Sequence, residues 1–165
     1  MNFMKRVFVI LCFLQFGSLM AQDDFLAKQY YNDGDFKKAV VFYERLVVKN
    51  PGRTDYTEGL IGCYQQLERF GDAQEFLLKK LDEPNAQAAL YVELGYNYTL
   101  QQLPEKAVEN YNKAISKIDE NPNYGYIIGL RFQKYALLDY AIKAYTRGME
   151  LNPQMDLNFQ LARIY

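Results

Sequence analysis

The sequence lacks histidine and tryptophan altogether, and its 165 residues include only two cysteines and five prolines. Without histidine, the commonest general base and the commonest metal ligand are missing. Cys12 and Cys63 are too few and too far apart to form a disulfide framework or a structural zinc site. With 19 basic and 20 acidic residues the net charge is −1, which gives no electrostatic footprint for nucleic acid or anionic lipid. These absences argue against an enzyme, a metal or cofactor site and a nucleic-acid-binding protein.

Apolar residues make up half of the chain, and 15 tyrosines and 11 phenylalanines are among its residues. This composition is too hydrophobic for a disordered chain, and a charged fraction of 24% is ordinary for a soluble surface. The length fits one domain or a short array of repeats. The sequence therefore predicts a folded chain with an aromatic core.

Residues 1–21 have the three-part layout of a secretory signal peptide. Lys5 and Arg6 form a basic start, an apolar run follows from Val7 to Phe16, and cleavage is expected after Ala21. A membrane anchor fits less well, because the apolar run is far shorter than the ~20 residues that span a bilayer. A lipoprotein fits less well too, since Cys12 lies inside the apolar run. We therefore expect export, to the periplasm or cell envelope of a bacterium, and no transmembrane span in the mature chain.

Cleavage after Ala21 leaves Cys63 as the only thiol. Its simplest role is that of a small buried hydrophobic residue. A reactive or intermolecular thiol is the alternative.

Four columns of residues recur every 34 positions in the rest of the chain. The first holds alanine, at Ala39, Ala73, Ala107 and Ala141. Four residues later come Tyr43, Leu77, Tyr111 and Tyr145, and nine residues earlier come Tyr30, Tyr64, Tyr98 and Phe132. Thirteen residues earlier come Leu26, Leu60, Leu94 and Ile128. A fixed period of this length indicates a stacked array of supersecondary units.

Each period divides into two helices. Gly34 suits the tight turn of the first period, and Pro104 suits the first turn of a helix in the third. Asn-Pro pairs at residues 50–51, 121–122 and 152–153 disfavour helix and predict where second helices end. The pattern predicts helix pairs over residues 23–49, 54–82, 86–119 and 123–151.

This pattern resembles the tetratricopeptide repeat (TPR) family. The third period carries the motif most fully, with Tyr91, Leu94-Gly95, Tyr98, Ala107 and Tyr111. The second is weakest, because Ile61 replaces the small residue and Leu77 the aromatic one. A pentatricopeptide array, which reads RNA, fits poorly because the chain is slightly acidic and carries an export signal.

The resemblance implies an all-α, right-handed superhelix of four helix pairs plus the first helix of a fifth. The repeats would span residues 22–53, 54–87, 88–121 and 122–154, with residues 155–165 as the start of a fifth repeat or a capping helix. We expect the chain to be the N-terminal part of a longer protein, with a lone capping helix as the alternative.

The residues expected to pack the repeats together are small side chains and the rings and aliphatic groups opposite them. They are Leu26, Tyr30, Ala39, Tyr43, Leu60, Tyr64, Ala73, Leu94, Gly95, Tyr98, Ala107, Tyr111, Gly129, Phe132, Ala141 and Tyr145.

In this family ligands are usually held on the concave side, which the first helices line. The residues expected there are Lys28, Tyr31, Asn32, Glu58, Gly62, Gln65, Gln66, Val92, Tyr96, Thr99, Tyr126, Leu130 and Gln133. We expect Tyr31, Tyr96 and Tyr126 to carry exposed rings that suit peptide recognition, or simply to form a tyrosine-rich surface. The carboxylate clamp of one TPR subgroup is absent, because Gly62, Ala89 and Glu93 stand where its later members would follow Lys28.

The sequence therefore predicts a non-catalytic scaffold that binds a protein or peptide partner in a concave groove. One alternative is a glycan or small-solute binder that uses Tyr31, Tyr96 and Tyr126 as stacking platforms. Another is a regulatory arm for a catalytic domain beyond residue 165.

Overall fold

The computed structural model describes residues 22–164, so the predicted signal peptide and Tyr165 lie outside the described residues. All regular structure within residues 22–164 is helical, which confirms the predicted all-α class. The described chain forms two compact units that divide between Arg69 and Phe70, in the turn between two helices.

The first unit contains a helix over residues 22–32, α2 at Phe36–Lys49 and α3 at Thr54–Gln66. The first helix and α2 are antiparallel: Tyr31 meets Phe36 beside the turn, and Asp23 meets Lys49 at the far ends. α3 then packs on α2.

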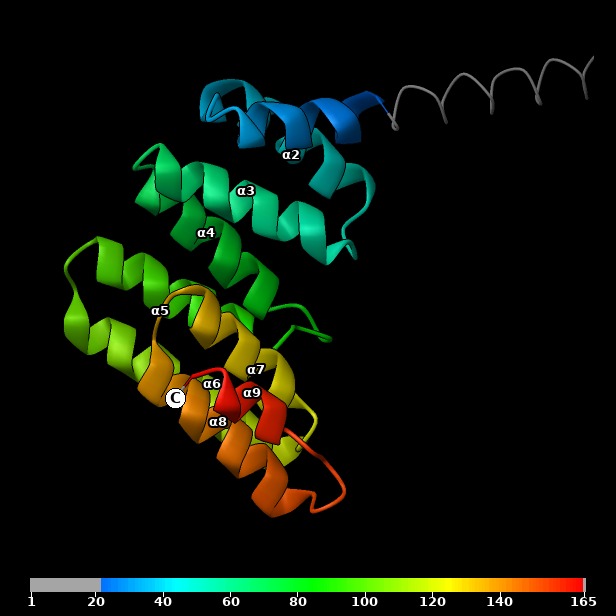
Figure 1. Cartoon of the computed structure of the whole chain (residues 1–165). Helices are drawn as coiled ribbons and strands as arrows, with labels where there is room; N and C mark the ends of the chain where they lie inside the picture. Colours follow the sequence, from blue (N-terminus) through cyan, green and yellow to red (C-terminus); the bar gives the residue numbers. More distant parts are fainter. Residues whose placement is uncertain (1–21, 165) are drawn as a thin grey trace, which may run out of the picture. The chain divides into compact units, whose positions relative to one another are not determined.

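The second unit contains α4 at Phe70–Leu81, α5 at Leu90–Leu100, α6 at Pro104–Glu120, α7 at Tyr124–Lys134 and α8 at Leu138–Leu151 (Figure 1). Its most extensive contacts join α5 to α6 and α7 to α8. These are the helix pairs of the third and fourth periods, in which α5 and α7 are the first helices and α6 and α8 the second helices. A short helix, α9 at Asn158–Ala162, contacts α8. At the place where the first helix of a fifth repeat was expected, the chain therefore forms a helix of five residues.

Local signals set the helix ends. Asp35 caps α2 by accepting a hydrogen bond from the Lys38 amide, and Pro104 occupies the first turn of α6. The C-cap residues of the second helices α2, α6 and α8 are Asn50, Asn121 and Asn152, each immediately before a proline. The Asn-Pro stops predicted from the sequence are therefore confirmed.

The turn inside each helix pair repeats a left-handed backbone conformation. Gly34 has a φ of +76°, which confirms the tight turn predicted there. At 34-residue spacing after it, Glu68, Gln102 and Ala136 have φ values of 57°, 60° and 55°. Residues with a Cβ adopt this conformation at a cost of about 1–2 kcal/mol. The array therefore imposes the turn even where the sequence holds no glycine.

Rings over glycine form the core of the third and fourth helix pairs. A Cβ on Gly95 would lie 2.4 Å from the Tyr111 ring, and one on Gly129 would lie 2.2 Å from the Tyr145 ring. In the first unit the Tyr43 ring of α2 lies over Gly59 of α3, which is a contact between consecutive helix pairs. Of the sixteen residues predicted to pack the repeats, all are buried except Leu26 and Tyr30, which are half-buried.

Candidate functional site

The second unit brings several residues predicted to bind a partner onto two neighbouring helices. Tyr96 and Thr99 lie on α5, and Tyr126, Leu130 and Gln133 lie on α7. The two helices contact each other directly. We call the surface formed by these five residues and Lys134 the α5–α7 face.

A buried carboxylate ties α7 to α5 beneath this face. Glu93 is 1% exposed, and its Oε1 accepts from Arg131 at 2.9 Å and from Lys134 at 3.4 Å. The Tyr135 hydroxyl donates to Oε2 of the same carboxylate. A buried charge is costly unless it is paired and hydrogen-bonded, and Glu93 has both kinds of partner. We call Glu93, Arg131, Lys134 and Tyr135 the Glu93 cluster; it holds two cations and one anion.

Tyr135 also fixes the orientation of Tyr96. Their rings stack with centroids 3.8 Å apart and planes 15° apart. Burial and the neighbouring Glu93 raise the pKa of Tyr135, so its hydroxyl stays protonated as a donor. The expectation of an exposed ring at Tyr96 is wrong, because Tyr96 is half-buried with one face against Tyr135. Tyr135 and Glu93 lie outside the repeating columns, so the period gave no signal for them.

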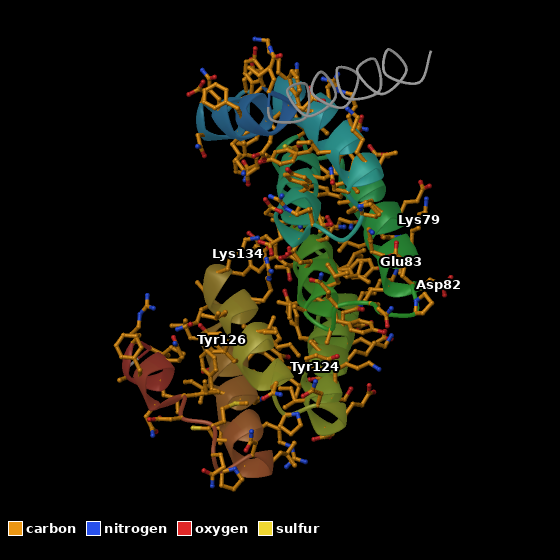
Figure 2. All side chains as sticks on the ribbon, turned by 90° about the vertical axis from the view of Figure 1, so that its right-hand side faces the viewer. Lys79, Asp82, Glu83, Tyr124, Tyr126 and Lys134 are labelled. Atoms are coloured by element: carbon orange, nitrogen blue, oxygen red, sulfur yellow. The ribbon has the colours of Figure 1, made fainter. Side chains whose placement is uncertain are left out.

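α7 presents an exposed stripe at helical spacing. Tyr126 and Leu130 are 40% and 37% exposed, and the Lys134 side chain is 44% exposed. Residues four apart lie above one another on a helix, so these three form one line along α7. Figure 2 shows Tyr126 and Lys134 toward opposite ends of that helix. The exposed ring predicted at Tyr126 is confirmed.

Thr99 and Gln133 connect the face to the core. The Thr99 hydroxyl lies 2.8 Å from the Tyr111 hydroxyl, and the Tyr145 hydroxyl donates to Gln133 at 2.6 Å. These are equivalent contacts one period apart. Both polar side chains thus hold the core tyrosines of the second helices, a role that the sequence did not predict for them.

The predicted binding residues of the first unit are less available. Tyr31 is half-buried, with edge contacts to Phe36 and Tyr43 at centroid distances of 5.2 and 6.1 Å. Its hydroxyl lies over Gly62, where a Cβ would approach to 2.5 Å. The expectation of an exposed ring at Tyr31 is therefore wrong, because neighbouring rings cover it.

Two further residues predicted for the groove are buried. Gln65 is 9% exposed, and within the described part of the chain its Nε2 has no hydrogen-bond partner. Val92 is completely buried. Both expectations are corrected, since helix phase alone does not show how far a neighbouring helix covers each position.

The remaining predicted residues of the first unit keep contact with solvent. Lys28 is exposed and pairs with Asp24 at 2.8 Å, and this hydrogen bond raises the pKa of Lys28. Asn32 and Gln66 are exposed, and Glu58 is half-buried.

Comparison with known proteins identifies the repeat. The family model described as "Tetratricopeptide repeat" matches residues 88–116, which cover α5 and most of α6. MamA, a solved structure, has a TM-score of 0.50 and 22% identity, with 83% of this chain and 75% of MamA covered. At that identity the likeness concerns the fold. Residues 88–116 therefore match a tetratricopeptide repeat (TPR), and the described residues have a TPR-like, all-helical fold.

Two other proteins are also similar to this chain. YrrB, a TPR protein with an unusual peptide-binding site, has a TM-score of 0.43 and 17% identity over 77% of this chain and 66% of its own. The general transcriptional corepressor trfA of Dictyostelium discoideum is 25% identical over 130 residues, 78% of this chain. This chain spans 9% of the length of trfA.

The one thiol in the described part of this chain is shielded from solvent. Cys63 is fully buried, and burial raises its pKa to about 12. It therefore stays a protonated thiol at neutral pH and is a poor nucleophile. Within residues 22–164 no group of three His, Cys, Asp or Glu side chains is arranged to hold a metal ion. None of the helices in the same range is both long and apolar enough to cross a membrane.

Proposed function

We propose that this chain is a TPR protein and acts as a non-catalytic scaffold that binds a polypeptide partner through the α5–α7 face. The TPR fold itself indicates a protein–protein interaction scaffold. The observation that carries the finer proposal is the exposed Tyr126–Leu130–Lys134 stripe, which lies on the helix that the Glu93 cluster fixes. A ring with a polar tip, an aliphatic group and a cation at successive helical turns suit an amphipathic segment.

Rigidity supports this role of the face. The Glu93 cluster and the Tyr96–Tyr135 stack restrict the side chains beneath and beside the stripe. Side chains that are already ordered lose less conformational entropy when a partner binds, so more of the contact energy remains as affinity. The exposed anchors Tyr126 and Leu130 would then contribute most to binding.

The polypeptide proposal is better supported than the glycan alternative. That alternative required three tyrosine platforms, and both Tyr31 and Tyr96 are half-buried against other rings. Tyr126 is the exposed member of the three. One exposed ring beside Leu130 suits an apolar side chain of a partner.

Affinity capture from bacterial envelope extract tests the polypeptide proposal. The bait is the mature chain, and the variant carries Tyr126→Ala with Leu130→Ala. The matched control carries Val108→Ala with Leu138→Ala, which removes exposed apolar groups from second helices. We expect a partner that the native chain and the control capture and the variant loses. Equal capture by variant and control would refute a role for the α5–α7 face.

We further propose that the chain is exported to the bacterial periplasm or cell envelope. The basic start, apolar run and Ala21 of residues 1–21 support this location. Expression in a bacterium followed by cell fractionation and N-terminal sequencing tests it. A mature chain that begins at Gln22 in the envelope fraction is expected, and an uncleaved cytoplasmic chain would contradict the proposal.

A further inference from the structure

The second unit contains a cavity of about 380 Å³ where the loops between its helix pairs meet. The end of α4, the loop that follows it, and Tyr91 of α5 form one part of the wall. Lys117 and Glu120 at the end of α6 and Tyr124 at the start of α7 form the other. Figure 2 shows Glu83 and Tyr124 on the side of the second unit that faces the viewer. None of the six residues of the α5–α7 face lines this cavity.

Hydrogen-bond acceptors gather around the cavity. α4 ends at Leu81 and α6 ends at Glu120, and both residues line the wall. The last carbonyl groups of a helix have no donor within the helix, and they carry the negative end of its dipole. The residues that follow α4 and α6 donate amides to the carbonyls of Leu78, Lys80 and Lys117. Within the described residues, the carbonyls of Leu81 and Glu120 accept no backbone hydrogen bond. The carboxylates of Glu83 and Glu120 add further acceptors, and the half-buried rings of Tyr91 and Tyr124 add two aromatic faces.

The backbone donors at the two helix starts near the cavity are already used. The Leu90 amide donates to Gln87 at 2.9 Å, and the Tyr91 amide donates to Ala88 at 3.2 Å. At the start of α7, the amides of Tyr124 and Gly125 donate to the carbonyls of Asn121 and Pro122 at 2.9 Å each. Because these amides are occupied, the cavity is poorly suited to an anion.

The cation in the wall is bound weakly. The Lys117 ammonium pairs with Glu120 at 2.6 Å, three residues along α6, with side-chain exposures of 34% and 62%. Exposed pairs of this kind contribute about 0–1 kcal/mol. A second cation with more hydrogen-bond donors can therefore replace Lys117 as the partner of Glu120 at a small cost in free energy. Glu83 forms an ion pair at 3.0 Å with Lys80, which does not line the cavity.

We propose that this cavity binds the guanidinium group of an arginine side chain, supplied by a polypeptide partner. A guanidinium has five N–H donors in a planar fork, which match carboxylate and carbonyl acceptors, and its flat face stacks on aromatic rings. The cavity volume lies in the range of small-ligand sites. The proposal that a polypeptide partner supplies the arginine rests on the proposed function. The proposal that the cavity binds a guanidinium group does not depend on that function.

Titration of the full, isotope-labelled chain with N-acetyl-arginine methylamide, followed by NMR, tests the cavity directly. We expect saturable shifts of the backbone amides of Asn85, Ala88 and Glu120. The neutral isostere N-acetyl-citrulline methylamide should give no saturable shift. Equal binding of citrulline, or no saturable shift up to about 50 mM, well above the millimolar Kd expected for one side chain, would overturn the proposal.

Two variants of the cavity should change the affinity in opposite directions. Glu120→Gln removes an acceptor and should weaken arginine binding by up to about fivefold, and Lys117→Gln removes the competing cation and should strengthen it by up to about fivefold. Glu109→Gln is the matched control, because Glu109 pairs with Lys113 on the same helix at 2.7 Å and does not line the cavity. A merely structural effect would not give opposite signs, so changes in the same direction would overturn the proposal.

The same titration separates this proposal from the proposed function. The Tyr126→Ala, Leu130→Ala variant should bind the arginine probe as the native chain does. If the probe binds but envelope capture does not depend on the α5–α7 face, the cavity assignment stands and the face proposal fails. If capture depends on the face but the probe does not bind, the reverse holds.

Discussion

In each unit two neighbouring first helices contact each other, and the two contacts are made by different kinds of side chain. In the first unit, the Tyr31 hydroxyl lies over the bare backbone of Gly62 on α3. In the second unit, the Glu93 carboxylate of α5 binds Arg131 and Tyr135 at the other first helix, α7. A ring on a glycine needs only space, whereas a buried charge needs every partner in place. The 34-residue period therefore fixes the backbone arrangement and leaves the chemistry of each contact open.

The largest expected effect comes from removing the buried charge. Glu93→Ala leaves Arg131 without its carboxylate and should lower the free energy of unfolding by about 3–5 kcal/mol. Asp55→Ala is the matched change in the first unit, where Asp55 pairs with Arg53 at 2.7 Å and lies 3.8 Å from Lys28. All three residues are exposed, so the change should cost less than about 1 kcal/mol. Urea unfolding followed by circular dichroism measures both. Similar losses for the two variants would contradict the contrast between the units.

The next effect tests how closely rings approach glycine. Gly129→Ala places a Cβ 2.2 Å from the buried Tyr145 ring, so it should destabilise the chain by about 1–3 kcal/mol. Gly62→Ala should cost less, because the atom it meets is the tip of the half-buried Tyr31 side chain.

Gly71→Ala is the control for these glycine substitutions. Gly71 lies in α4 with no atom within 4 Å of its added Cβ, so the change should stabilise the chain by about 0.5–1 kcal/mol. Thermal unfolding ranks the three variants. A destabilised Gly71→Ala, or a neutral Gly129→Ala, would refute the packing explanation.

A smaller pair of effects concerns the turns. Gly34 in the first unit and Ala136 in the second share the left-handed conformation. Gly34→Ala should destabilise by about 1 kcal/mol, and Ala136→Gly should stabilise by about the same amount. Chemical unfolding of both variants checks the signs, and the same sign for both would mean that backbone strain does not decide these turns.

The smallest effect at neutral pH concerns two equivalent tyrosines, one in each unit. Burial raises the pKa of Tyr43 and of Tyr145 to about 12, from an ordinary value of 10. The folded chain therefore keeps protons that the unfolded chain releases above pH 10. The stability that these groups contribute is complete below pH 10 and is lost as the pH rises through about 12.

Alkaline titration checks this window. Helical signal by circular dichroism and phenolate absorbance, recorded together, should change over the same pH range. Complete tyrosine ionisation near pH 10 with the helices intact would show that these hydroxyls are not protected.

The repeat columns explain how much of the fold could be predicted. The residues placed in the core by the 34-residue period are buried, apart from Leu26 and Tyr30, and the Asn-Pro pairs end the helices as expected. Prediction of the candidate site was less complete. Tyr126 and Leu130 are exposed as expected, but Tyr31, Gln65 and Tyr96 are covered by neighbours to different extents. The Glu93 cluster was missed because Glu93 lies 38 to 42 residues before its three partners and shares no repeating column with them.

The sequence by itself determined the period, the helix type and the points where helices stop, because these depend on residues close together in the chain. The tertiary structure decided which side chains of the first helices remain exposed and which tyrosine meets which glycine. It also decided which cations surround Glu93. Those outcomes depend on how closely two helices approach, and that distance is set by the side chains of both helices together. A column of similar residues therefore predicts burial, but it does not identify the partner in contact.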